Sequence, residues 1–215
     1  MKKIIDGFLA GMMISIGGAV FMACYEQYRV IGAVLFCVGL LTVCWKGYSL
    51  YTGRIGLMIE HHTKEDWAVL LLGLLGNAVS SIVFGYLIAY AIPSIKEAAL
   101  IACTAKLSQG YLVGFIRGIL CGILIYLSID IYKNHKSVLG VLLCVPAFIL
   151  SGYEHSIADI FYFAASGIAS AKAFGYIWMI ILGNSVGGLL IPTLNLLKNL
   201  TVKKTLMESN DNAND

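Results

Sequence analysis

The sequence predicts an all-α integral membrane protein with six transmembrane helices, arranged as two inverted three-helix repeats in which helices 2 and 5 are broken. Composition is the first observation: 59% of the 215 residues are hydrophobic and 13% are charged, whereas soluble domains carry about 25% charged residues. Length is the second, because a crossing takes about 20 apolar residues, which allows about six or seven crossings and no soluble domain. An internal repeat is the third.

Uninterrupted apolar runs predict four of the crossings, at residues 5–23, 67–92, 110–131 and 173–197. Evenly placed glycines in the first run favour a packed transmembrane helix over a cleaved signal peptide. The second crossing, residues 30–59, is broken at 46–54, and the fifth, which begins at residue 138, is broken at 151–159. Residues 93–109 form a weakly apolar connection. The polar residues 198–215 are expected to form a disordered cytoplasmic tail.

Three matches in the same order relate the two halves of the chain. GFLAG at residues 7–11 recurs as GYLVG at 110–114, and LGNAVSS at 75–81 recurs as LGNSVGG at 182–188, with the two breaks between these anchors. Chance similarity among glycine-rich helices is the alternative. The repeats cover about 1–97 and 104–197 within a single domain, residues 1–197. Because each repeat holds three crossings, the second enters the membrane from the opposite side, as in transporters whose site lies between broken helices.

The charge distribution predicts the orientation of the chain. A formal charge of +3 is too small to indicate a nucleic-acid partner, and most Lys and Arg residues fall on the side that carries both termini. The positive-inside rule therefore places both termini in the cytoplasm of a multi-pass protein of the inner or plasma membrane. The six cysteines lack CxxC spacing and are interpreted as small buried hydrophobes, with a disulfide between Cys24 and Cys103 as the minority alternative.

Glu154 and His155 stand where hydropathy places the middle of the membrane. An ionisable side chain there costs about 2.5–3.5 kcal/mol on insertion scales, which favours a functional role. Gly152 indicates that the helix breaks at this point, and broken helices at this depth line a cavity or a substrate path. His155 is the group there that can exchange a proton near neutral pH. The alternative is a short re-entrant loop that holds a satisfied core histidine.

Other polar residues mark the same pathway. Thr52 and Gly53 occupy the first break, where a hydroxyl and freed backbone N–H groups suit a small anion. Lys106 is the lone cation of its stretch and is interpreted either as an attractor of anions or as a snorkelling lysine. On the first interpretation, Lys106→Glu reduces anion flux and leaves the fold intact. The pair His61 and His62 is interpreted as solvated, so no metal or cofactor is expected.

Several of these stretches resemble motifs of the formate/nitrite transporter family. Residues 152–159, GYEHSIAD, are similar to that family's Glu-His signature, and residues 50–53, LYTG, to its first-break motif. Residues 105–107, AKL, and 183–188, GNSVGG, resemble its conserved lysine and its last-helix motif. The resemblance implies an aquaporin-like fold, six crossings and a homopentamer with one pore per protomer. It also implies transport of small monovalent anions, namely formate, nitrite or hydrosulfide, of which formate is the commonest substrate class.

The resemblance also assigns roles by position. Thr52 and His155 would flank a central site, with Lys106 in a vestibule and Glu154 and Asn184 in support. The apolar constrictions and the adjoining pathway residue would be Phe36, Leu40, Leu50, Phe148 and Tyr51.

The sequence departs from the family pattern where Ser49 replaces Glu, Tyr51 replaces Phe, and Arg54 and Asp159 replace Asn. Lys46 is an added charge, and Arg117 has no assigned role beyond a possible contact between subunits.

Three functions compete on these residues. The first is a conduit in the lipid bilayer for a small monovalent anion and a proton, in which the anion passes the apolar constrictions as the neutral acid. The second is an aquaporin-like pore for small neutral solutes, against which the paired Asn-Pro-Ala motifs are absent. The third is an intramembrane enzyme that uses Glu154 and His155, but no second cluster at ligand spacing accompanies that pair. The sequence therefore predicts a transporter and not an enzyme.

Overall fold

The computed structural model describes residues 1–60 and 62–211, and the regular structure of these residues is helical throughout. His61 and residues 212–215 lie outside the described residues. The helices, in chain order, are α1 (Lys2–Ala23), α2 (Arg29–Leu35), α3 (Cys37–Lys46), α4 (Tyr51–Arg54), η1 (Ile55–Ile59), α5 (Lys64–Ala91), α6 (Pro93–Ser108), α7 (Tyr111–His135), α8 (Leu139–Leu150), α9 (Ser156–Ser166) and α10 (Ala171–Asp211).

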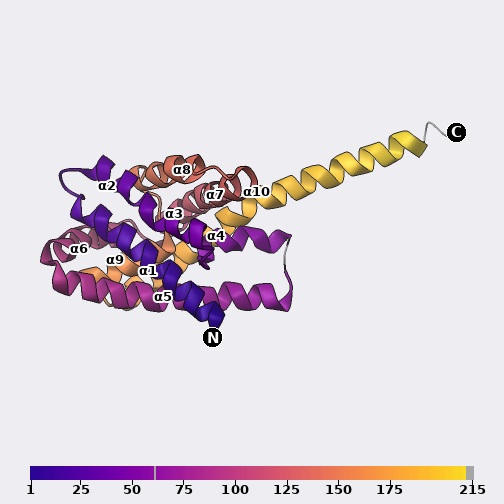
Figure 1. Cartoon of the computed structure of the whole chain (residues 1–215). Helices are drawn as coiled ribbons and strands as arrows, with labels where there is room; N and C mark the ends of the chain where they lie inside the picture. Colours follow the sequence, from indigo (N-terminus) through magenta and orange to yellow (C-terminus); the bar gives the residue numbers. More distant parts are fainter. Residues whose placement is uncertain (61, 212–215) are drawn as a thin grey trace.

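Five helical segments of the described chain are long and apolar enough to cross a membrane. Their mean hydropathy lies between 1.7 and 2.2, and they comprise α1, α2 with α3, α5, α7 and the part of α10 up to Lys203. Two shorter apolar helices, α8 and α9, follow one another around the second break. The chain is therefore a multi-pass membrane protein, with the helices packed side by side in one bundle (Figure 1).

The structure changes two expectations about the connections. Residues 93–108, expected only as a weakly apolar connection, form helix α6, which begins with Pro93 at a first-turn position where its missing N–H costs nothing. The C-terminal stretch is not disordered as far as residue 211, because α10 continues to Asp211 and extends away from the bundle (Figure 1). Residues 198–208 are rich in Lys, Leu, Met and Glu, which are good helix formers, and this propensity outweighs the polarity of the stretch.

Both breaks lie within the predicted ranges but are shorter, because Thr52 and Gly53 belong to helix α4 and α9 already begins at Ser156. A glycine in the left-handed conformation lies at each break. Gly47, with φ of +68°, ends α3, and the chain then runs through residues 48–50 to the short helix α4. Gly152, with φ of +70°, follows the end of α8 and leads through residues 153–155 into α9. A left-handed conformation costs other residues about 1–2 kcal/mol, so glycine is the residue that turns the chain here.

Glycines also set how closely the long helices approach. A Cβ on Gly11 of α1 would lie 2.5 Å from the carbonyl oxygen of Asn77 on α5, and a Cβ on Gly7 would meet Gly73 as closely. The same relation holds between α7 and α10, where a Cβ on Gly122 would overlap the backbone of Asn184. Small residues at these crossings let the backbones touch and bring two asparagines against the two breaks.

Candidate functional site

Asn77 holds the first break in place. Its side chain is fully buried on α5, and its Oδ1 accepts a hydrogen bond of 2.8 Å from the N–H of Tyr51. Its Nδ2 donates to the carbonyl oxygens of Gly7 at 2.7 Å and Ser49 at 2.9 Å. The amide therefore satisfies backbone groups that the broken helix leaves without partners, each of which would cost about 1–3 kcal/mol if buried and unpaired.

Asn184 makes the matching contacts at the second break. Its Oδ1 accepts from the N–H of Ser156 at 2.8 Å, and its Nδ2 donates to the carbonyl oxygens of Gly118 at 2.9 Å and Glu154 at 2.8 Å. Asn184 is the residue to which the family resemblance assigns a supporting role, and these bonds show what its amide contacts. Asn77 was not among the predicted site residues, although the repeat of LGN at 75–77 and 182–184 was a signal that could have identified it.

The two breaks meet at Thr52 and His155, which lie 103 residues apart in the chain. Thr52 Oγ1 and His155 Nε2 are 3.0 Å apart, and both side chains are buried. His155 is also the N-cap of α9, because its Nδ1 accepts the N–H of Ala158 at 3.1 Å. A nitrogen that accepts carries no proton, so the neutral imidazole holds its proton on Nε2 and donates it to Thr52. The backbone thus selects which ring nitrogen faces Thr52.

Apolar side chains enclose this contact. The Phe148 ring stacks on the His155 ring with centroids 5.9 Å apart, and the Phe36 ring meets Phe148 edge-on at 6.2 Å. Leu40 and Leu50 are buried as well. These four residues are the predicted apolar constrictions, and of them Phe148 lies directly against His155 while Phe36 packs on Phe148.

Pockets lie near both residues of the Thr52–His155 contact. One, of about 120 Å³, is lined by His155, Phe148 and Lys106, and we call it the outer pocket. Another, of about 100 Å³, is lined by Leu50 and Gly53, the neighbours of Thr52, and we call it the inner pocket. His155 therefore borders the outer pocket, and residues on either side of Thr52 border the inner pocket.

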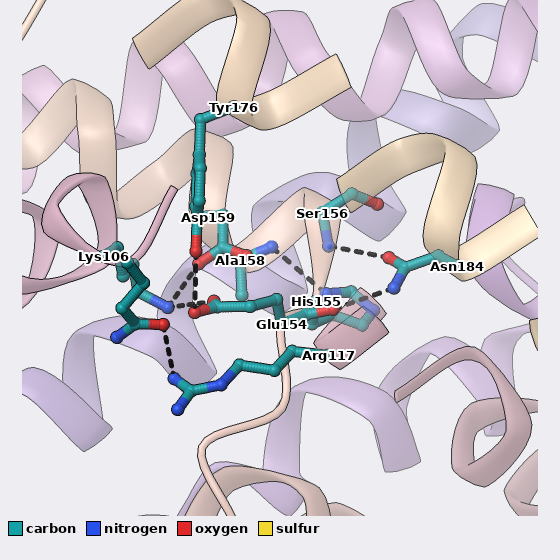
Figure 2. A network of polar contacts seen from close by, with 10 residues as sticks. Lys106, Arg117, Glu154, His155, Ser156, Ala158, Asp159, Tyr176 and Asn184 are labelled. Carbon is teal, nitrogen blue, oxygen red and sulfur yellow. Dashed lines mark hydrogen bonds and ion pairs between the residues drawn. The ribbon is translucent and has the colours of Figure 1, made fainter. Parts of the chain in front are cut away.

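Lys106 does not stand alone in the outer pocket. Its ammonium forms ion pairs with Glu154 and, at 2.9 Å, with Asp159, and both carboxylates are buried (Figure 2). Tyr176 completes the group by donating a hydrogen bond of 3.2 Å to Glu154. The ammonium is therefore held by α9 and by the residue before His155, which differs from the freely snorkelling lysine considered from the sequence. Asp159, whose role the sequence left open, is a partner of Lys106.

Two further residues, the predicted pathway residue Tyr51 and the unassigned Arg117, have structural contacts. Tyr51 turns its hydroxyl to the Ser185 hydroxyl of α10 at 2.8 Å and is largely buried, while its N–H binds Asn77. Arg117 donates to the Gln109 side chain at 2.6 Å and lines the outer pocket, which gives this unassigned residue a position beside the site. Among the described residues, no group of three His, Cys, Asp or Glu side chains is arranged to hold a metal ion.

Comparison with known proteins identifies sequence relatives of this chain. A family model described as formate/nitrite transporter matches residues 1–197. The nitrite transporter NirC of Escherichia coli is 29% identical over 74% of this chain and 66% of its own length. Formate-nitrite transporter 2 of Toxoplasma gondii is 24% identical over 88% of this chain and 49% of its own length. The chain thus spans between about half and two thirds of these relatives.

Solved structures share the fold. A channel described as an FNT family ion channel has a TM-score of 0.77 at 24% identity, with 91% of this chain and 89% of that one covered. A pentameric formate channel with formate bound has a TM-score of 0.75 at 20% identity, with 93% and 97% covered. The fold described above is therefore similar to that of these two channels.

Proposed function

Because the chain belongs to the formate/nitrite transporter family, we propose that it conducts small monovalent anions of weak acids across the cell membrane, with formate as the leading substrate and nitrite or hydrosulfide as the alternatives. Members of this family are transporters and channels and not enzymes. Nothing in the described structure or among the relatives favours a pore for neutral solutes.

The contact between Thr52 and His155 carries the proposal. His155 borders the outer pocket and residues around Thr52 border the inner one, and the ring of Phe148 on His155, with Phe36 packed on it, offers an anion no hydrogen bonds in place of water. A bare anion at such a constriction bears a large desolvation cost, whereas a neutral weak acid bears much less. His155 presents its Nε2–H toward Thr52, so the anion acquires its proton at that nitrogen. The proton is drawn ultimately from bulk water, which leaves hydroxide behind.

We infer the arrangement of the membrane spans from the internal repeat of the sequence. Residues 1–197 form one transmembrane domain of six spans, with inverted repeats at about 1–97 and 104–197 and a cytoplasmic segment at 198–215. The matching bonds of Asn77 and Asn184 support this symmetry, since each asparagine holds the break of its own repeat. Both termini lie in the cytoplasm by the positive-inside rule. Thr52 and His155 then meet near the middle of the bilayer.

The assembly we propose is a homopentamer with one pathway in each protomer. The pentameric formate channel of similar fold supports it. An apolar groove of about 420 Å³ between α5, α9 and α10, which exposes Leu71, Tyr86, Phe174 and Trp178 among others, supplies a surface for subunit or lipid contact. Cross-linking in mild detergent is expected to give a ladder that ends at five protomers, and a monomer alone would contradict the assembly.

Proton-coupled flux in proteoliposomes tests the function. Formate added outside vesicles that hold the native protein is expected to alkalinise the external medium as formic acid enters. His155→Asn is expected to assemble normally and to lose this alkalinisation while still passing anions as an electrical current. His135→Asn, at an exposed histidine near the end of α7, is the matched control and is expected to behave as the native protein. Full proton coupling in His155→Asn would assign His155 a structural role.

A further inference from the structure

The outer pocket contains more basic groups than Lys106. Arg29 and Arg117 line it together with Lys106, and Glu154 and Asp159 are its acidic members. Lys106 is bound to both carboxylates, so this group of three carries no net positive charge whether one or both carboxylates are ionised. The two arginines are different, because no described carboxylate forms an ion pair with either guanidinium.

Arg117 lies next to the approach to His155. It comes from α7, its side chain is partly buried, and it extends toward the residues around Lys106 (Figure 2). Its Nη1 would lie 3.8 Å from a Cβ on Gly152, which places the guanidinium beside the second break. The hydrogen bond to Gln109 uses one of its five N–H donors. In the described structure the guanidinium makes no other side-chain hydrogen bond and lines the pocket, so it has donors to offer an anion there.

Arg29 lies nearer to solvent on the same pocket. It is the first residue of α2, its side chain is exposed, and its guanidinium lies over the Tyr25 ring at 5.3 Å from the centroid. Stacking on a ring face orients the guanidinium and leaves its N–H edge free. An arginine fork of this kind matches the two oxygens of a planar anion, which a point charge does not.

We propose that Arg29 and Arg117, and not Lys106, form the anion-collecting site of the outer pocket, and that they favour planar anions with two oxygens, such as formate and nitrite, over hydrosulfide. This inference rests on the proposed function and names the substrate class of the same pathway. Formate and nitrite can each accept two parallel N–H bonds from one guanidinium. Hydrosulfide has a single acceptor atom and gains only from the charge.

Initial rates of anion uptake into proteoliposomes, measured against concentration, test the proposal. Arg29→Gln and Arg117→Gln are each expected to raise the half-saturating concentration of formate and nitrite by about fivefold or more, as the loss of a charge-assisted bond requires, with the maximal rate unchanged. The increase for hydrosulfide is expected to be smaller. Arg117→Lys keeps the charge without the fork and is expected to narrow the preference for formate over hydrosulfide. Lys172→Gln, an exposed cation outside the pocket, is the control.

The outcomes separate this inference from the proposed function. If the native protein moves none of the three anions, the proposed function fails. If the native protein conducts and both glutamine variants keep the native half-saturating concentration, the arginine site alone is refuted. A loss of maximal rate with unchanged half-saturation also refutes it, because that pattern indicates a structural role. Arg29 is exposed, so Arg29→Gln provides a folded variant even if Arg117→Gln fails to assemble.

Discussion

Removal of the Lys106 ammonium should destabilise the protein because two buried carboxylates would lose their partner. Breaking a buried ion pair by deleting one member typically costs about 3–5 kcal/mol, since the remaining charge stays buried and uncompensated. Glu154 and Asp159 are 2% and 1% exposed, so water cannot replace the ammonium without opening the structure. For a chain of this length, such a loss corresponds to a melting temperature lower by about 6–20 °C. Lys106→Met is therefore expected to melt well below the native protein.

Thermal unfolding of the purified protein in mild detergent measures this effect. The triple variant Lys106→Met, Glu154→Gln and Asp159→Asn removes all three charges together and is expected to recover at least half of the loss. Lys96→Met, at an exposed lysine on the same helix α6, is the matched control and is expected to melt as the native protein does. A Lys106→Met variant within about 2 °C of native would refute the reasoning, as would a triple variant that melts no higher than Lys106→Met.

The same cluster changes what is expected of charge reversal. Lys106→Glu, predicted from the sequence to reduce flux in an intact fold, would bring three carboxylates together in a buried site. Because the three carboxylates would lie next to one another, their ionisation would be unfavourable and their mutual repulsion would disturb the local packing. The variant is therefore expected to destabilise the protein at least as much as Lys106→Met. A flux measurement on Lys106→Glu alone would confuse loss of folding with loss of anion attraction, and the arginine variants avoid that confusion.

Two further outcomes follow from the site. Asn77→Ala and Asn184→Ala each remove three buried hydrogen bonds and should lower the free energy of unfolding by about 3 kcal/mol, which is visible as a lower melting temperature. The control Asn195→Ala, at an exposed asparagine, should have little effect. Equal melting temperatures of all three variants would contradict the role of the two buried asparagines in holding the breaks. Phe148→Ala removes the ring stacked on His155 and should raise anion current relative to proton-coupled uptake, with exposed Phe174→Ala as the control; an unchanged ratio would count against Phe148 as a constriction.

Much of the fold was predictable because membrane helices are determined by local hydropathy. Every long apolar run of the sequence is a helix in the structure, and both breaks lie where the apolar runs are interrupted. Gly47 and Gly152 break the helices through a left-handed backbone conformation that glycine adopts readily. Helix α6 was missed because its residues have little hydropathic contrast, although Pro93 at a helix start was a usable signal.

The sequence named many residues of the candidate site but did not predict which of them form ion pairs or hydrogen bonds with one another. The resemblance named Thr52, His155, Lys106 and Glu154, yet it could not show that Asp159 binds Lys106. Nor did it assign Arg117 a place beside Gly152. Ion pairs between side chains that are far apart in the chain depend on how helices pack, and no local pattern carries that information.

By itself, the sequence determined the membrane class, the long apolar helices and the approximate positions of the two breaks, because hydropathy and glycine conformation act over a few neighbouring residues. Only the tertiary structure decided what meets at the breaks. Thr52 reaches His155 across 103 residues, and Lys106 reaches Glu154 across 48, because close packing through glycine brings separate helices into contact. The physical reason is that the electrostatics of a buried site depends on distances between groups that the chain order does not specify.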